Sequence, residues 1–455
     1  MVSSASADHF IREPRLRLSQ RRSAPHVSSN RSTDLCCGFL LSALLPNVTA
    51  EPAKPAALLR ARVQGCGPSG ALAALALAKA GWAVQVVDPL SPEQLLSRSR
   101  AYALSHSSRE LLERLGLWIS LQSAMAPFRR LELCDRALHR QVTFTLADLP
   151  GSRRRRSAVG DGSAAGAVGW ILQHQPLMEA LLQAVRQEPG ITLCLGDPVA
   201  CAQVSPDASS DRAPDLVVAA DGHHSPTRSA ARLRSWGFAY RQGCLTVQVG
   251  LRGSASDQAW ELFRPEGPFA VLPLGGDAYQ LVWSAPLPRL RQLEALDGAA
   301  FLDALSAALP EELQAEVLLD QPRAFPVGWE MAWPLRRRGL LLLGEAAHRC
   351  HPVGGQGLNL CWRDVAVLAD LARQSAVTPR RFPAAGLPGR YARRRWLDML
   401  LVLLATDALV RLFSNRQPLL LPLRRLALQL LASLPLLRRL SLRAMTDGPC
   451  RLLRA

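Results

Sequence analysis

The sequence lacks the features that mark several large classes of protein. Its ten cysteines include no CxxC pair, which argues against a dense disulfide framework and against the commonest zinc-binding spacing. No window reaches the roughly 18 uncharged apolar residues of a transmembrane helix, and the best C-terminal run, residues 399–406, is bounded by Asp398 and Asp407. We therefore expect reduced thiols and a chain that can touch a membrane without crossing it.

Acidic residues are scarce at the C-terminal end. The chain has 54 Lys and Arg against 37 Asp and Glu, a formal net charge of +17, and residues 380–455 hold 15 of the basic and only 3 of the acidic residues. Residues 58–379 are nearly neutral, so general nucleic-acid binding is not expected. Arginine pairs that alternate with Leu-rich blocks suit an anionic membrane surface. The alternative is that the leucines pack on the protein and the arginines face solvent.

Residues 1–57 show little hydrophobic periodicity. Their Ser- and Arg-rich composition suits an organellar transit peptide, but two acidic residues by position 13 and a late apolar block at 36–45 do not. We expect residues 1–57 to be a disordered or non-native N-terminal extension. The protein is then cytoplasmic and peripheral on a membrane, or organellar if this segment is a true transit peptide.

A glycine motif opens the folded part at residues 63–88. Gly65, Gly67 and Gly70 form GxGxxG, followed by small aliphatic residues and a β-prone run that ends at Asp88. In this spacing the first glycine allows a tight turn, the second lets the backbone approach a pyrophosphate, and the third lets the helix pack closely on the strand. The helix N-terminus offers free N–H groups to phosphates, and the acidic residue can accept a bond from a ribose hydroxyl. The segment therefore predicts a dinucleotide-binding βαβ unit.

The strand before this motif is irregular. A central parallel strand is buried on both faces and normally aliphatic, yet residues 58–64 include Arg60, Arg62 and Gln64. This raises the hypothesis that the sequence upstream of about Val63 is not native.

A second glycine-rich motif lies at residues 340–371. An aliphatic strand ends at Gly344-Glu345, a loop rich in Pro and Gly spans 351–357, and a helical pattern follows. Two shorter segments, ADGHHSPTR at 220–228 and RAYALS at 100–105, accompany it. Together these motifs resemble the flavoprotein aromatic hydroxylases related to p-hydroxybenzoate hydroxylase. More narrowly, they resemble the UbiH-type hydroxylases of ubiquinone biosynthesis.

The resemblance implies an α/β fold, with a Rossmann-like FAD-binding domain, a β-sheet substrate domain and basic C-terminal helices. The segments are 58–125, 167–235 and 335–378 for the FAD-binding domain, 126–166 and 236–334 for the substrate domain, and 386–455 for the helices.

The resemblance also implies site residues. The backbone of Pro352 and Gly354 is expected beside flavin C4a. Glu345 stands where the family has Asp, and its longer carboxylate still accepts hydroxyl hydrogen bonds. Gln173 is assigned to the flavin, with a solvent-facing side chain as the open alternative. The expected FAD-binding residues are Gly65, Gly67, Gly70, Asp88, Arg100, Gln173, Asp221, Gly222, Glu345, Gly357, Leu358 and Asn359.

The chemistry implied is aromatic hydroxylation. NAD(P)H reduces FAD, O2 adds at flavin C4a, and the hydroperoxide passes oxygen to a prenylated phenol or quinone precursor. Two alternatives remain open: an isoprenoid-lipid flavin reductase or cyclase, and a non-catalytic membrane-associated flavoprotein scaffold. Glu345, His348 and His351 form E-x-x-H-x-x-H, but Pro352 follows at once, so we expect a loop and no metal site.

Overall fold

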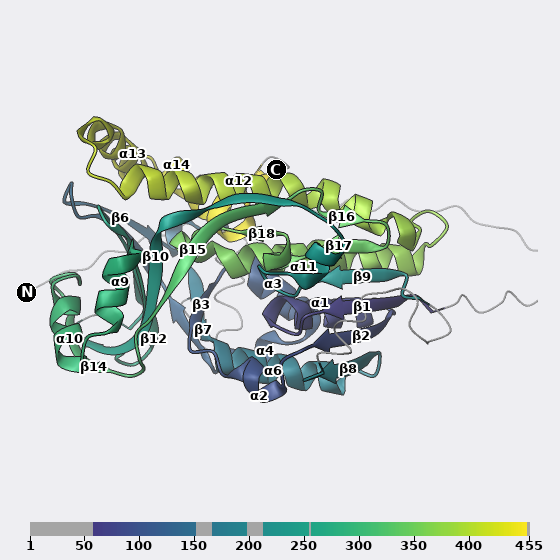
Figure 1. Cartoon of the computed structure of the whole chain (residues 1–455). Helices are drawn as coiled ribbons and strands as arrows, with labels where there is room; N and C mark the ends of the chain where they lie inside the picture. Colours follow the sequence, from purple (N-terminus) through teal and green to yellow (C-terminus); the bar gives the residue numbers. More distant parts are fainter. Residues whose placement is uncertain (1–57, 152–165, 198–212, 254–255, 453–455) are drawn as a thin grey trace, which may run out of the picture. The chain divides into compact units, whose positions relative to one another are not determined.

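The glycine motif follows strand β1 of a six-stranded sheet with the order β16-β17-β9-β1-β2-β8 (Figure 1). This computed structural model describes residues 58–151, 166–197, 213–253 and 256–452, so the expectation for residues 1–57 lies outside the described residues. All pairs in the sheet are parallel except β16 with β17. The strands are β1 (Arg60–Gln64), β2 (Ala83–Asp88), β8 (Ile191–Leu195), β9 (Leu216–Ala219), β16 (Arg336–Arg337) and β17 (Leu340–Leu342).

Helix α1 (Pro68–Ala78) connects β1 to β2 and is buried almost all round. Its small and aliphatic side chains contact α6 (His174–Gln187) and α11 (Gln356–Val377) as well as the sheet. An apolar pattern without a polar face is what a helix enclosed on all sides requires.

Strand β1 pairs with β2 on one side and β9 on the other, despite its arginines. Ala61 and Val63 are buried, whereas Arg60 is exposed at the start of the strand and Arg62 is only half-buried. The expectation of an aliphatic strand buried on both faces is therefore too strict for the entry end of this one. The hypothesis that the sequence upstream of about Val63 is not native stays a prediction.

A second, nine-stranded sheet is built mainly from the segments predicted to form the substrate domain, with β18 added from the segment 335–378. Its order is β18-β15-β10-β13-β12-β11-β5-β6, with β14 also paired to β10, and β11 runs parallel to β5. Helices α9 (Leu287–Glu294) and α10 (Gly298–Ser306) pack on one face. The strands are β5 (Arg130–Asp135), β6 (Arg140–Thr145), β10 (Ser235–Arg252), β11 (Gln258–Arg264), β12 (Gly267–Gly275), β13 (Ala278–Pro286), β14 (Gln314–Leu318), β15 (Arg323–Ala332) and β18 (His348–Arg349).

A third, smaller sheet has three strands in the order β3-β7-β4. It consists of β3 (Ala101–Leu104), β7 (Gly169–Gln173) and β4 (Met125–Phe128). The smaller helices are α2 (Pro92–Leu96), α3 (His106–Leu115), α4 (Trp118–Gln122) and α8 (Pro226–Ala230).

The C-terminal helices are α12 (Leu387–Phe413), α13 (Leu421–Ser433), α14 (Pro435–Asp447) and α15 (Pro449–Leu452), drawn in light green to yellow in Figure 1. Helix α12 contacts α11 and β15, and α13 contacts β6. Among the described residues, no single helix is long and apolar enough to cross a membrane. The helices at 418–433 and 435–447 have the length and apolar composition of a membrane span only when they are taken together, and the chain bends by 99° between them.

Candidate functional site

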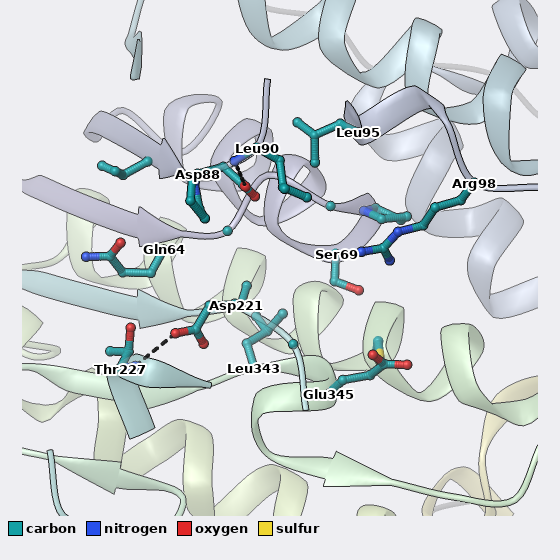
Figure 2. A pocket seen from close by; sticks show the side chains of 18 of the residues that line it. Gln64, Ser69, Asp88, Leu90, Leu95, Arg98, Asp221, Thr227, Leu343 and Glu345 are labelled. Atoms are coloured by element: carbon teal, nitrogen blue, oxygen red, sulfur yellow. Dashed lines mark hydrogen bonds between the residues drawn. The ribbon is translucent and has the colours of Figure 1, made fainter. Parts of the chain in front are cut away.

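A cavity of about 700 Å³ opens at the carboxyl ends of β1, β2, β9 and β17 (Figure 2). Ligands of open parallel sheets bind at this edge, and the volume lies in the range of cofactor pockets. Asp88 ends β2, Asp221 follows β9, and Glu345 comes from the turn after β17. Eight of the twelve predicted FAD-binding residues therefore meet at one cavity, although they lie far apart in the sequence.

The glycine motif shapes the floor of this cavity. Gly65 has φ +98°, and a Cβ there would collide with the carbonyl group of Ala220. A Cβ on Gly70 would collide with the carbonyl oxygen of Gly65. A Cβ on Gly67 meets nothing within 4 Å, and Gly67 begins α1 without a side-chain cap. The first amides of α1 are thus left for a ligand, as a phosphate group requires.

Asp88 links the glycine motif to the turn that follows β2. Its Oδ2 accepts from the Cys66 N–H at 2.6 Å, and its Oδ1 accepts from the Leu90 N–H at 2.9 Å. A carboxylate has about four lone-pair positions, so Asp88 can still accept a ribose hydroxyl.

Asp221 and Gly222 form a second turn at the cavity. The Asp221 carboxylate accepts from the hydroxyl of Ser225 and from the Thr227 N–H, the latter at 3.0 Å. Arg228 joins this turn to the loop after β17 by donating to the carbonyl oxygen of Ala346 at 3.0 Å. Gly222 has φ +84°, which favours glycine at this position.

Glu345 lies in a 3₁₀ turn, η2 (Gly344–Ala346), and its exposed side chain lines the cavity. It accepts no hydrogen bond from the described residues, so its carboxylate is available to sugar or ribityl hydroxyls. The extra methylene relative to Asp does not prevent it from lining the cavity.

A buried ionic network holds the Glu345 turn in place. Asp364 on α11 accepts from the Gly344 N–H at 3.0 Å and is hydrogen-bonded to His348 at 2.8 Å. Arg395 on α12 donates to Asp364 at 2.6 Å and to Asp398 at 2.7 Å. Burial acts to raise the pKa of Asp364, but Arg395 and His348 outweigh it and hold the pKa below its usual value. The C-terminal helix α12 therefore fixes a cofactor turn more than 40 residues earlier.

The start of α11 is fixed by Asn359. Its Oδ1 accepts from the Ser105 N–H and the Ser108 hydroxyl, and its Nδ2 donates to the carbonyl oxygens of Ala103 and Gly355. The side chain of Asn359 is thus occupied in supporting the loop, which leaves its backbone for the predicted flavin contact. The neighbouring Leu358 lines the cavity, and Gly357 has open space around it.

Six of the predicted site residues lie outside the cavity lining: Gly70, Gln173, Pro352, Gly354, Gly357 and Asn359. Pro352 and Gly354 belong to the loop that precedes α11, and Gly354 turns its N–H toward Glu261 of the substrate sheet at 3.3 Å. Gln173 ends β7 without lining the cavity, and the next residue, His174, lines it instead. Arg100 lines the cavity as expected from the sequence.

The sequence reasoning missed several lining residues. His174 is hydrogen-bonded to the hydroxyl of Tyr102 and to the carbonyl oxygen of Leu95, both at 2.8 Å. Tyr102 on β3 lies two residues after Arg100, a spacing that could have identified it. Arg98, Ser69 and Thr227 had no comparable signal, because only the fold brings them to this edge (Figure 2).

The described residues hold no group of three or more His, Cys, Asp and Glu side chains arranged to bind a metal ion. His348 is paired with Asp364, and His351 accepts from the Val353 N–H at 3.2 Å. The residues present do fit FAD. Uncapped amides lie at the start of α1, Gly67 leaves room for a phosphate, and Glu345 offers an acceptor without a partner.

Comparisons with known proteins identify the family of the chain. Residues 60–373 match a family described as FAD binding domain. The chain is 31% identical over 396 residues to an uncharacterised protein of Synechocystis sp., covering 84% of this chain and 92% of the other. It is 30% identical over 375 residues to the Escherichia coli 3-demethoxyubiquinol 3-hydroxylase, covering 80% and 91%.

Solved structures show the same fold. HpxO of Klebsiella pneumoniae, complexed with FAD and uric acid, gives a TM-score of 0.64 at 19% identity, covering 86% of this chain and 98% of the other. The p-nitrophenol 4-monooxygenase PnpA of Pseudomonas putida gives 0.64 at 16% identity, with coverage of 86% and 98%. The predicted α/β fold and FAD as cofactor are confirmed. With its FAD-binding match, its hydroxylase relatives and its cavity in place, the chain belongs to the FAD-dependent aromatic monooxygenases, in the group of the ubiquinone-biosynthesis hydroxylases.

Proposed function

We propose that this FAD-dependent monooxygenase hydroxylates the ring of a prenylated phenol or quinone precursor, with NAD(P)H as reductant and O2 as oxidant. The observation that carries the proposal is the junction between the cofactor cavity and the substrate sheet. The loop before α11 reaches the sheet through Gly354 and Glu261, while Leu358 at the start of the same helix lines the cavity. The hydroxylase name of the Escherichia coli relative supports a quinone precursor, and favours hydroxylation over a reductase, cyclase or scaffold role.

The protein residues supply binding, orientation and exclusion of water. The amides of α1 and the space at Gly67 would receive the phosphates of FAD, and Asp88 and Glu345 would accept hydrogen bonds from its hydroxyl groups. When bound, FAD supplies the redox chemistry, by taking reducing equivalents from NAD(P)H and activating O2.

A reconstitution experiment tests this function. Purified protein loaded with FAD is expected to bind one flavin per chain and to oxidise NADPH or NADH faster when 2-farnesylphenol is added. The product should gain one oxygen atom. The proposal would be contradicted if the protein binds FAD but its rate of NAD(P)H oxidation does not change when prenylated phenols are added.

We also propose that the C-terminal helices rest on an anionic membrane surface, with the protein in the cytoplasm, or in an organelle if residues 1–57 direct it there. Exposed leucines recur along α13 and α14, at 423, 426, 430, 436 and 440. Arg425 and Arg439 are exposed beside them. Such a surface combines apolar area with positive charge, as interfacial helices do.

Not every arginine of this region is available to a membrane. Arg424 is 1% exposed and donates to the carbonyl oxygen and side-chain oxygen of Asn415, at 2.9 and 2.7 Å. Arg438 donates to Asp148 at 2.7 Å. Both side chains support the fold, so a membrane test should leave them intact.

Flotation with anionic liposomes provides that test. We expect the R425Q/R439Q double variant to lose most of its binding, and the R252Q/R291Q variant, which removes the same charge from the substrate domain, to keep it. Equal flotation of both variants would overturn the membrane proposal.

A further inference from the structure

Glu261 is a carboxyl group in the middle of an otherwise apolar stretch of β11. Successive side chains of a strand point to opposite faces. Trp260 and Leu262 pack into the cluster under α9 and α10, whereas Ala259 and Phe263 pack on the opposite face with Val353 of the loop before α11. Glu261 shares the face of Ala259 and Phe263. It therefore lies between the substrate sheet and the loop expected beside the flavin ring.

Glu261 has no cationic partner within the described part of the chain. It is 7% exposed, and its one hydrogen bond among the described residues comes from the Gly354 N–H at 3.3 Å. No ion pair of the described residues includes it. An isolated buried carboxyl group is costly for a fold, and such groups concentrate at functional sites.

The surroundings of Glu261 favour its protonated, uncharged form. Its register partners, Ala270 on β12 and Leu133 on β5, carry no charge. The nearby titratable group on β10 is the thiol of Cys244. Burial raises the pKa of this thiol, and the charge of Glu261 raises it further. Burial raises the pKa of Glu261 to about 7, although the Gly354 N–H acts to lower it. A carboxyl group that exchanges its proton near neutral pH is suited to general acid–base work.

A second buried polar group at the same loop lacks a partner. His351 is 0% exposed, and its Nδ1 accepts from the Val353 N–H, so the proton lies on Nε2. This Nε2–H has no acceptor among the described residues. Burial lowers the pKa of His351 to about 4, so the ring stays neutral and the donor persists. Val353 and Gly354 are adjacent, so the amides that bind His351 and Glu261 follow one another in the loop.

We propose that Glu261 is the catalytic residue that accepts the phenolic proton of the aromatic substrate. The inference rests on the hydroxylase function proposed above. The phenolic O–H bond breaks, a new O–H bond forms on the Glu261 carboxylate, and the electron pair stays on the phenolate oxygen. The step needs no oxidant or reductant. The phenolate activates the ring toward attack by electrophilic oxygen, and Glu261 returns its proton to solvent after turnover.

The competing role for Glu261 is to anchor the loop through Gly354. Two substitutions separate the roles, because a glutamine amide oxygen can still accept from Gly354 but cannot take up a proton at neutral pH, whereas leucine can do neither. E261Q should therefore keep FAD and lose catalysis. E261L should weaken both.

The experiment uses the FAD-loaded enzyme with 2-farnesylphenol. For E261Q we expect kcat to fall by about 100- to 10,000-fold, the scale of general-base catalysis. The Kd for FAD should stay within about twofold. In the wild type kcat should rise with pH through about 7, the pH at which Glu261 loses its proton, and this dependence should vanish in E261Q.

Infrared spectroscopy gives a readout that does not depend on turnover. The carboxyl stretch of a protonated buried acid should titrate near neutral pH in the wild type and be missing from E261Q. The proposal is overturned if E261Q keeps the wild-type kcat and pH profile. It is equally overturned if E261Q loses FAD as E261L does, or if no carboxyl signal titrates. Inactive wild-type enzyme with a normal infrared titration would instead point to a wrong substrate class.

Discussion

The buried carboxyl group of Glu261 should make the stability of the protein depend on pH in a predictable direction. Its pKa is raised from an ordinary value of 4.5 to about 7. Between these values the folded protein holds a proton that the unfolded chain releases, so stability is lost as the pH rises. At 1.36 kcal/mol per pKa unit, the full effect is about 3 kcal/mol, and roughly 2.5 kcal/mol of it falls between pH 5 and pH 8.

The comparison of wild type with E261Q isolates this effect, because all other titrating groups are common to both proteins. We expect the free energy of unfolding of E261Q, measured by denaturant titration of the FAD-loaded proteins, to gain about 2.5 kcal/mol on the wild type between pH 5 and pH 8. A difference that stays constant over this range would refute the reasoning. Glu261 would then be ionised throughout, and its burial would be compensated by a partner.

Three further substitutions test the cofactor site. R395M leaves Asp364 and Asp398 buried without their shared partner, so the free energy of unfolding should fall by about 3–5 kcal/mol and FAD titration should show weaker binding, with exposed Arg393 changed to Gln as the control. G70A places a Cβ against the Gly65 carbonyl oxygen, so flavin fluorescence should show little or no FAD bound, whereas G151A, in open space and outside the cavity lining, should retain it. E345A removes an acceptor without a protein partner, so FAD affinity should fall by roughly tenfold without loss of stability, and E345D should retain most of it. Unchanged FAD binding in any of the three would remove that residue from the site.

The sequence was sufficient for the parts of the fold that depend on local pattern. The glycine spacing at 65–70 and the acidic residue at 88 require a βαβ turn, and the structure brings both to the cavity. Aliphatic runs such as 340–342 became buried parallel strands. These features are predictable because each follows from the geometry of one strand, turn and helix.

Long-range partners could not be predicted. Nothing in the local sequence shows that Arg395 binds Asp364, that Arg424 is buried against Asn415, or that Glu261 faces Gly354. The same limit applies to Arg60 and Arg62, whose exposure depends on where β1 enters the sheet. Charge in a sequence shows how many ionic groups exist, but the fold decides which of them are buried.

Oxygen transfer to the substrate tests the central claim most directly. FAD-loaded enzyme is reduced anaerobically with NADPH in the presence of 2-farnesylphenol, then mixed with isotopically labelled O2, and the product is analysed by mass spectrometry. A hydroxylated ring carrying one labelled oxygen atom is the predicted result. Reoxidation of the flavin with the phenol recovered unchanged, or with oxygen that derives from water, would contradict the account.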